Sequence, residues 1–257
     1  MDNFLLDSGR SILESIPTMS YESDQLLSEY LLMHYGTDEQ LMPWGFGPKD
    51  AIGFPVRTVT HFPEDHVERA LDLGCAVGRS TFELSKSASE TIGIDFSANF
   101  IAAAEHLRSH GSIDYPLRET GSQTTPATAV IPDGSKPETC RFLEGDAMNL
   151  PDDLGSFDRV HAANLICRLP DPEKLLQRLP DLVRPGGHLV LATPCTWLDE
   201  FTPADHQPDG DTFEWLKNQL SSSFKLENRA DEPFLIRETA RKFQWTVSLV
   251  TLWKRAD

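Results

Sequence analysis

The chain has 257 residues, 39% hydrophobic and 25% charged, so it is long enough for one large domain with a buried core. Its 23 lysine and arginine residues against 40 aspartate and glutamate residues give a net charge of −17. A surface this acidic repels phosphate backbones and anionic membranes. We therefore expect a small-molecule substrate, and neither a nucleic-acid nor a membrane partner.

The sequence shows no signal for membrane insertion or export. It has no apolar run of about 18 residues, the minimum for a membrane-spanning helix. The N-terminal residues MDNFLLD are acidic and lack the basic region of a secretory signal. The four cysteines are too widely spaced for a zinc site and are expected to be reduced thiols: Cys75, Cys140, Cys167 and Cys195. We expect a cytoplasmic protein without a metal.

A helix is expected first, at residues 22–35, where apolar side chains recur at helical spacing up to Gly36. Residues 42–55 are rich in glycine and proline, which indicates a loop with at most a short helical piece. We interpret residues 1–60 as a helical extension that acts as a lid, followed by the main domain at 61–257.

Strands and helices then alternate along the chain. Strands are expected at 69–73, 91–95, 140–143, 157–162 and 187–193. Helices are expected at 78–88, 97–110 and 172–183, with Ser97 as the N-cap of the second. This alternation predicts a parallel sheet with right-handed crossovers.

Two regions depart from the alternation. Residues 111–139 are rich in threonine, serine, proline and glycine, so we expect a flexible insertion. The C-terminal part is expected to form a strand at 224–229, a helix near 235–242 and a β-rich strand at 244–253. This order predicts an antiparallel end to the sheet.

The sequence LDLGCAVGR at 71–79 lies between a predicted strand and a predicted helix. A dinucleotide-binding loop requires G-x-G-x-x-G, but Ala76 and Arg79 occupy the second and third glycine positions. The spacing D-x-G-x-x-x-G is met by Asp72, Gly74 and Gly78. This spacing resembles motif I of the class I methyltransferases, which use S-adenosylmethionine and release S-adenosylhomocysteine.

Three later segments match the same family in the same order. Asp95 ends the second strand, where an acid can accept hydrogen bonds from ribose hydroxyls. Asp146 follows the third strand, and Asn164 follows the fourth, while LVRPGG at 182–187 resembles the turn before strand five. The resemblance implies a Rossmann-like α/β fold, with a mainly parallel seven-stranded sheet, an antiparallel C-terminal strand and helices on both faces.

The resemblance also implies the cofactor-binding residues. Asp146 would receive the adenine amino group, and the fourth strand would end beside the methyl group. The expected cofactor-binding set is Asp72, Gly74, Cys75, Ala76, Gly78, Asp95, Phe96, Ser97, Asp146, Ala147, Asn164 and Leu165.

A narrower resemblance lies mainly outside this set. Segments YESD at 21–24, YLLMHYG at 30–36, PCTWLDEFTP at 194–203 and PFLIRE at 233–238 through KFQW at 242–245 resemble ovothiol-biosynthesis methyltransferases. That family methylates the imidazole π nitrogen of 5-thiohistidine, also called 4-mercaptohistidine, to give ovothiol A. The chemistry is in-line displacement, and an imidazole nitrogen with a free lone pair needs positioning more than a strong base.

Candidate residues around the acceptor follow from this resemblance. Asn164, His161 and Tyr21 are the candidates for catalysis: Asn164 for orientation, His161 for proton handling and Tyr21 for closing the lid. The candidates for substrate binding are Tyr21, Arg168, Trp197, Glu200, Phe201, Arg237 and Lys242. Arginine binds carboxylates bidentately, which suits an amino-acid substrate. Two alternatives stay open: a different small amine, thiol or natural-product acceptor, and a module that binds the cofactor without catalysis.

Overall fold

The structure is a computed structural model that describes residues 22–257. Its helices of four residues or more are α1 Asp24–Tyr35, α2 Asp38–Leu41, α3 Phe54–Val59, α4 Arg79–Ser85, α5 Ala98–His110, α6 Pro172–Leu182 and α7 Thr212–Leu220. Its strands are β1 Val67–Leu73, β2 Ala88–Asp95, β3 Ser112–Arg118, β4 Thr124–Val130, β5 Cys140–Glu144, β6 Phe157–Ala163, β7 Val183–Thr193, β8 Phe224–Thr239 and β9 Lys242–Arg255.

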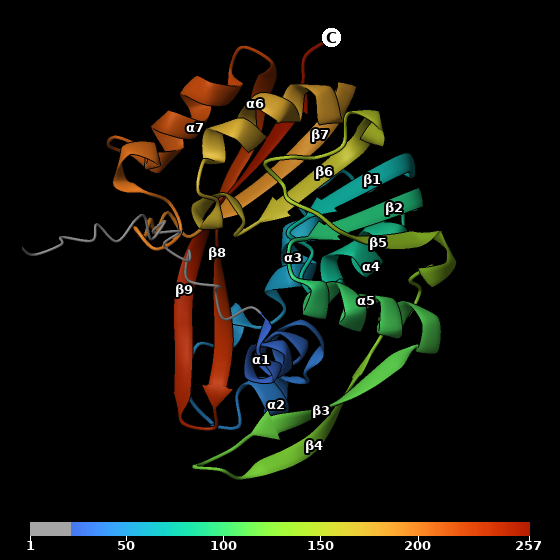
Figure 1. Ribbon diagram of the computed structural model, residues 1–257, viewed down its shortest axis with the longest axis vertical. Coiled ribbons are helices and arrows are strands. Elements are labelled where there is room, and N and C mark those ends of the chain that lie inside the picture. The colour runs from blue at the N-terminus through green and yellow to red at the C-terminus, as the bar shows by residue number, and fades with distance from the viewer. Residues whose placement is uncertain (1–21) are drawn as a thin grey trace, which may run out of the picture.

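Seven strands form one sheet in the order β5-β2-β1-β6-β7-β9-β8, and β3 pairs with β4 in a separate hairpin (Figure 1). The strands from β5 to β7 are parallel, whereas β9 is antiparallel to both β7 and β8. The predicted parallel sheet with an antiparallel C-terminal end is therefore confirmed.

The strand order reverses between β1 and β6, which pair in register from Ala70↔Arg159 to Leu73↔Ala162. All but the last residue of β6 is buried, as expected for a central parallel strand covered on both faces. In open α/β sheets, ligands bind beyond the carboxyl ends of the strands at such a reversal. This edge is where the structure positions its candidate site.

Helices cover both faces of the sheet, as predicted. On one face, Leu175 and Leu179 of α6 and Leu216 of α7 pack with sheet residues such as Leu71 and Val160 in one core cluster. The other face is covered by α3, α4 and α5, whose buried residues include Phe54, Leu84 and Phe100. Ser97 caps α5 as predicted, because its side chain accepts a hydrogen bond from Phe100 N.

The stretch 111–139 contains the β3–β4 hairpin, which the expectation of a flexible insertion missed. Tyr115, Leu117, Ala127 and Ala129 alternate along its strands and are buried against α1 and α5. These apolar residues are few and separated by polar ones, so composition concealed a half-buried hairpin. Strand pairing from Ser112↔Val130 to Arg118↔Thr124 fixes its register.

The helix expected near 235–242 is wrong: these residues belong to the end of β8, the turn and the start of β9. Phe234 packs against Phe54 of α3, while Leu235 on the opposite face packs with Met42 and Ala51. Burial on alternate faces requires a strand, so tertiary contacts override the local helical preference. The β8–β9 hairpin consequently extends well beyond β7 (Figure 1).

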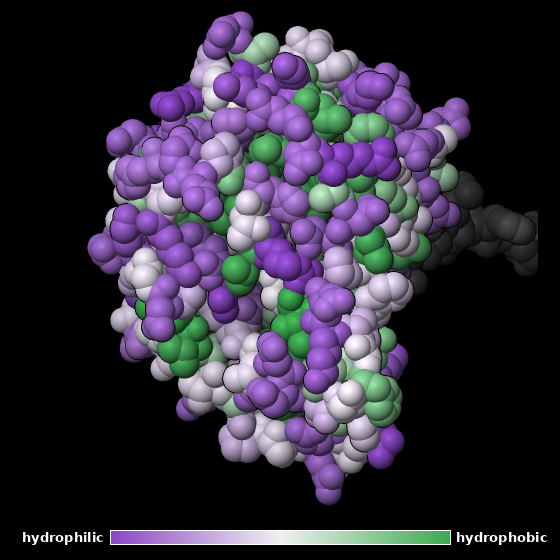
Figure 2. All heavy atoms as spheres, turned by 180° about the vertical axis from the view of Figure 1, so that it is seen from behind, coloured by the Kyte–Doolittle hydropathy of each residue, from purple (hydrophilic) through white to green (hydrophobic). Residues whose placement is uncertain are grey.

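Hydrophilic residues predominate on the face seen in Figure 2, with hydrophobic residues in small separate groups. This distribution agrees with the charge of −17. Within residues 22–257, no helix has both the length and the apolar character needed to cross a membrane. All four cysteines are free, and Cys195 alone among them is exposed.

Candidate functional site

The loop between β1 and α4 adopts the strand–turn–helix geometry that the motif requires. Gly74, Ala76 and Gly78 have φ values of 69°, 47° and 88°, in the left-handed region. A Cβ atom on Gly78 would lie 2.8 Å from the Phe142 ring. Gly78 is therefore required both for its backbone conformation and for the close approach of α4 to the sheet.

Asp72 and His161 form a buried network beneath this loop. The Asp72 carboxylate accepts a hydrogen bond from Thr81 Oγ1 at 2.7 Å and pairs with His161 Nδ1 at 2.8 Å. His161 Nε2 lies 3.0 Å from Thr58 Oγ1, and the Asp72 and His161 residues are each 1% exposed. With both ring nitrogens occupied and no solvent access, His161 positions Asp72 and cannot reach an acceptor. Asp72 likewise supports the loop from below instead of contacting a ligand.

Asp95 joins the loop to the start of α5. Its carboxylate accepts hydrogen bonds from Ala76 N at 2.8 Å and Ser97 N at 2.9 Å. Burial raises the pKa of Asp95 against the lowering effect of these donors. The neighbouring Phe96 ring is 77% exposed, which is unusual for a large apolar side chain. Asp95 and Phe96 thus present a carboxylate and an open aromatic face at the end of β2.

Asp146 lies on the adjoining loop. Gly145 N donates to Asp95 O at 2.9 Å, so the chain after β5 runs beside the end of β2. The Asp146 side chain accepts from Met148 N at 2.8 Å and caps its own turn, while Ala147 is buried. The structure therefore brings Asp95 and Asp146 to neighbouring positions on the same edge.

Asn164 ends β6 across the strand-order reversal. It has a φ of 55°, a conformation more accessible to asparagine than to most residues. Its Oδ1 accepts from Ser248 Oγ of β9 at 2.8 Å, and its N donates to Ala192 O at 2.8 Å. Leu165 packs where a Cβ on Gly74 would stand, at 3.1 Å. These contacts hold Asn164 rigidly beside the motif loop.

Helix α1 covers the loop from outside. Tyr35 donates to Val77 O at 2.7 Å, and Arg79 Nη1 donates to His34 O at 3.0 Å. Burial, assisted by Arg79, lowers the pKa of His34 to about 3, so its imidazole is neutral. Burial also raises the pKa of the Cys75 thiol, which stays protonated beneath the loop. Tyr21, the proposed lid residue, lies outside the described residues.

The structure does not bring the expected substrate-binding residues together at one place. Arg168 lies just beyond β6, with its guanidinium carbon 4.4 Å from the centre of the Phe201 ring. Trp197 is half-buried against Trp215 and donates to Thr212 Oγ1 at 3.0 Å, which makes it part of the α7 packing. Glu200 is exposed. Arg168, four residues after Asn164, thus lies beside Phe201.

Arg237 and Lys242 lie at the far end of the β8–β9 hairpin. Arg237 is 2% exposed and pairs with Glu119 at 2.7 Å, and Lys242 pairs with Glu238 at 2.6 Å. Ser248 aligns with Glu232, six residues before Glu238, and strands rise about 3.3 Å per residue. Glu238, between these two residues in the sequence, is therefore roughly 20 Å along β8 from the residue aligned with Ser248, the partner of Asn164. The structure does not bring Arg237 or Lys242 to the end of β6.

Comparison with known proteins bears on this edge of the sheet. Residues 71–191 match the family model described as a methyltransferase domain. The match begins within β1 and ends within β7, so it includes the glycine loop, Asp95, Asp146 and Asn164. Over these residues the chain is similar to class I methyltransferase domains. Domains of this class use S-adenosylmethionine.

Curated relatives are similar to this chain over part of its length. The trans-aconitate 2-methyltransferase of Deinococcus radiodurans is 30% identical over 149 residues, covering 57% of this chain and 46% of that protein. The demethylmenaquinone methyltransferase of Lactococcus lactis is 31% identical over 123 residues, covering 47% and 39% respectively. This chain thus spans less than half the length of these relatives.

Solved structures share the fold. The N-methyltransferase NodS from Bradyrhizobium japonicum, in complex with S-adenosyl-L-homocysteine, has a TM-score of 0.52 and 16% identity. The similarity covers 90% of this chain and 99% of NodS. A putative methyltransferase from Bacillus halodurans gives a TM-score of 0.53 at 13% identity, over 79% and 99% of the two chains. The Rossmann-like methyltransferase fold of the chain is therefore established.

Sequence reasoning missed several residues that complete the site. Thr58, Thr81 and Ser248 hold His161, Asp72 and Asn164 through side-chain hydrogen bonds. Thr58 and Ser248 are 103 and 84 residues distant in sequence from their partners. No local pattern signals such contacts. Thr81 differs, because it lies in the first turn of α4, and a polar residue on the buried face of a helix can be recognised in the sequence.

Proposed function

We propose that the protein is an S-adenosylmethionine-dependent N-methyltransferase that methylates the imidazole π nitrogen of 5-thiohistidine to give ovothiol A. The observation that carries the transferase activity is the convergence of the glycine loop, Asp95 and Asn164 at the strand-order reversal. The acceptor rests on the resemblance of the flanking segments to ovothiol-biosynthesis methyltransferases.

The residues present suit S-adenosylmethionine. The Asp95 carboxylate can accept hydrogen bonds from ribose hydroxyls, and the exposed Phe96 ring offers a surface for adenine. Asp146, on the adjoining loop, would accept the adenine amino group. The bound cofactor supplies an electrophilic methyl group on a sulfonium. Its positive charge also suits a protein with a net charge of −17.

Asn164 is the residue that we propose to orient the acceptor or the amino-acid part of the cofactor. Its Oδ1 is occupied by Ser248, and among residues 22–257 its amide nitrogen has no protein acceptor. The amide N–H groups can therefore donate to a ligand, with the amide orientation assigned from the Ser248 contact. The left-handed backbone and the bond to Ala192 O reduce the freedom of this side chain.

The transfer itself requires little acid–base assistance. The lone pair of the π nitrogen forms the new bond to carbon, the sulfur–methyl bond breaks, and its electron pair returns to sulfur. A ring that was neutral before transfer becomes cationic, and its remaining N–H proton can pass to solvent. The chain must hold the ring in line with the methyl group, which is an effect of positioning. We propose Arg168, which lies beside Phe201, as the partner of the substrate carboxylate, and Glu200 as the partner of its ammonium group.

Incubation with methyl-13C-labelled S-adenosylmethionine and 5-thiohistidine, followed by NMR, tests this function. We expect the label on the π nitrogen, with histidine as a poor acceptor. Asn164→Ala should reduce kcat/KM at least tenfold, whereas Asn218→Ala, at an exposed position on α7, should leave it unchanged. Transfer to the thiol, or to no position of 5-thiohistidine, would sink the acceptor assignment.

A second acceptor class has support from the relatives. Their names specify trans-aconitate and demethylmenaquinone, so proteins similar over this domain act on chemically different acceptors. This chain is accordingly a candidate methyltransferase for another small amine, thiol or natural product. A competition assay with 5-thiohistidine, histidine and thiol acceptors, in which the release of S-adenosylhomocysteine is measured, distinguishes the two proposals. Cofactor binding without turnover on any acceptor would instead indicate a non-catalytic module.

A further inference from the structure

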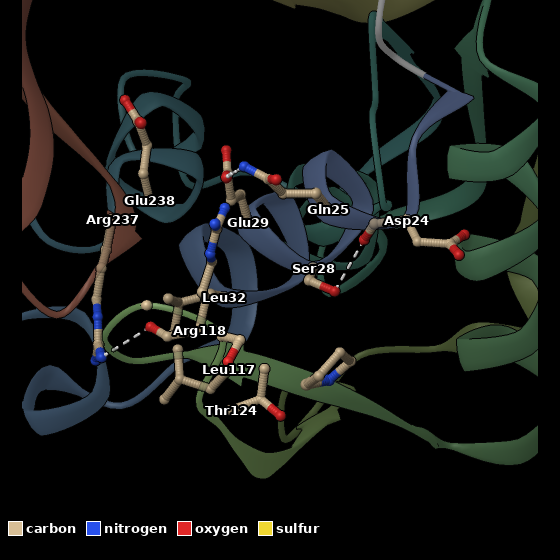
Figure 3. Close-up of a pocket in the computed structure, with 13 residues that line it drawn as sticks. Asp24, Gln25, Ser28, Glu29, Leu32, Leu117, Arg118, Thr124, Arg237 and Glu238 are labelled. Carbon is tan, nitrogen blue, oxygen red and sulfur yellow. Dashed lines mark hydrogen bonds between the residues drawn. The ribbon is translucent and has the colours of Figure 1, made fainter.

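A cavity of about 210 Å³ lies between α1, the end of the β3–β4 hairpin and the end of β8 (Figure 3). The turn of this hairpin reaches the β8–β9 turn, where Ala240 N donates to Glu119 O at 3.0 Å. Three segments that are distant in sequence therefore border the cavity. Glu238 on its wall is about 20 Å along β8 from the residue aligned with Ser248, so the cavity is separate from the end of β6.

Glu29 of α1 is a buried carboxylate on the wall of this cavity. It is 8% exposed, and Gln25 Nε2 donates to its Oε1 at 2.8 Å. Within residues 22–257, no lysine, arginine or histidine nitrogen lies within 4.0 Å of it. A buried charge without a counter-ion is energetically costly, so the environment of the Glu29 carboxylate favours the binding of a cation.

Arg118 supplies the opposite charge on the same wall. Its side chain is exposed, and in the described part of the chain its guanidinium makes no ion pair within 4.0 Å. Burial raises the pKa of Glu29 and the nearby Glu238 carboxylate adds to this rise, whereas the hydrogen bond from Gln25 and the charge of Arg118 oppose it. Glu29 and Arg118 are thus close enough to interact and too far apart for direct pairing.

The other charges at the cavity are already paired. Arg237 pairs with Glu119 at 2.7 Å and Glu238 with Lys242 at 2.6 Å. Asp24 is exposed at the rim. With respect to residues 22–257, the unpaired charges at the wall are accordingly those of Glu29, Arg118 and Asp24. This set offers a site for an ammonium group and, separately, a site for a carboxylate.

The remaining lining and the size restrict the ligand further. Leu32 and Leu117 contribute apolar surface to the cavity. Pockets for drug-sized ligands occupy about 300–1,000 Å³, so this smaller cavity suits a molecule the size of an amino acid. A small apolar side chain would contact the two leucines.

We propose that this cavity is a second small-molecule site, which binds a free α-amino acid with its ammonium group at Glu29 and its carboxylate at Arg118. The zwitterion spans two opposite charges that the protein leaves without a direct ion pair. Charge-assisted hydrogen bonds at both ends give the selectivity for molecules that carry both groups.

Helix α1 is shared by this site and the cofactor loop. One side of α1 lines the cavity through Gln25 and Glu29, and its end donates from Tyr35 to Val77 O. A ligand that fixes α1 should therefore strengthen cofactor binding, and the cofactor should strengthen ligand binding by the same factor.

Calorimetric titration of the full chain, saturated with S-adenosylhomocysteine, tests the site without reference to the methyl acceptor. The probes are L-valine, isobutylamine, which lacks the carboxylate, and isovalerate, which lacks the ammonium group. We expect L-valine to bind at least tenfold more tightly than either analogue. Equal binding of isovalerate, or no heat with L-valine at millimolar concentration, would overturn the proposal.

Matched variants locate the binding. Glu29→Gln and Arg118→Gln should each weaken L-valine binding at least tenfold, while Glu64→Gln and Arg141→Gln, at exposed positions away from the cavity, should not. Arg118 is exposed, so its variant should fold even where Glu29→Gln does not. Unchanged L-valine binding in Arg118→Gln would assign the ligand to another site. L-valine should also tighten S-adenosylhomocysteine binding severalfold, and an unchanged affinity would refute the coupling through α1.

Discussion

At the scale of single residues, the acidic residues of the domain have different environments and therefore different tasks. Asp72 is fully buried with two side-chain partners, whereas Asp95 lies at the edge of the sheet with two backbone donors. The sequence assigned both to the cofactor. Asp72 lies deeper below the carboxyl edge than Asp95. Asp72 therefore supports the loop, whereas Asp95 is available to a ligand.

The role of His161 can be tested by its removal. His161→Ala leaves the buried Asp72 carboxylate with Thr81 as its remaining side-chain donor, so we expect the free energy of unfolding to fall by about 3 kcal/mol. His66→Ala, at an exposed position, should change it by less than about 0.5 kcal/mol. Denaturant unfolding measures both. A proton-handling role predicts instead an altered pH–rate profile with stability retained.

The raised pKa of Asp95 has a consequence for cofactor binding. Ribose hydroxyls donate to the charged carboxylate, so bound cofactor lowers this pKa and binding releases protons. Affinity should therefore rise with pH between the bound-state and the free-state pKa of Asp95 and become constant above the latter. Calorimetry with S-adenosylhomocysteine across the acidic range measures this dependence.

Substitution of Asp95 provides the control. Asp95→Asn removes the titrating group and should weaken binding about tenfold or more, because hydrogen bonds to charged groups contribute about 1.5–3 kcal/mol. Asp133→Asn, on an exposed loop, should retain wild-type affinity and pH dependence. A pH dependence that persists in Asp95→Asn would assign it to another group.

At the scale of elements, the β3–β4 hairpin and the extended β8–β9 hairpin are the two parts added around the parallel strands. Both were misread from sequence, the first as a flexible insertion and the second as partly helical. In each, the deciding contacts are with α1, α2 or α3, which come much earlier in the chain. Local composition carries little information about such partners.

The packing of the β3–β4 hairpin predicts a large effect of truncation. Leu117 is 7% exposed in the cluster with α1 and α5, so Leu117→Ala should lower the free energy of unfolding by about 3 kcal/mol. Val130→Ala in the same hairpin is the control, because Val130 is 57% exposed and should contribute little. Urea unfolding compares them. Equal, small effects would mean that the hairpin does not share the core.

At the scale of the whole molecule, one sheet edge combines the loop of β1, the acids after β2 and β5, and Asn164 after β6. Helix α1 covers the loop at this edge through hydrogen bonds that involve Tyr35 and Arg79, and the chain as a whole carries a net charge of −17. Arg237 and Lys242 belong to a different part of the molecule, roughly 20 Å along β8. The molecule therefore has room for two separate ligands.

The cofactor assignment predicts a ligand-specific change in global stability. S-adenosylhomocysteine at one hundred times its Kd should stabilise the fold by about 2.7 kcal/mol, which corresponds to about 5–10 °C in Tm for a chain of this size. NAD⁺ at the same concentration should produce no shift, because Ala76 and Arg79 replace two glycines of the dinucleotide loop. A thermal melt with each ligand distinguishes the cofactors, and stabilisation by NAD⁺ alone would refute the assignment.

The sequence by itself determined the sheet, its cofactor loop and the positions of Asp95, Asp146 and Asn164. These features depend on short-range patterns: apolar strands, glycines at fixed spacing and polar residues directly after strands. The tertiary structure alone decided that Asp72 and His161 lie beneath the loop, that 112–130 pairs as a hairpin, and that Arg237 is far from Asn164. Burial and distance depend on contacts between residues about 100 positions apart, which no local pattern encodes.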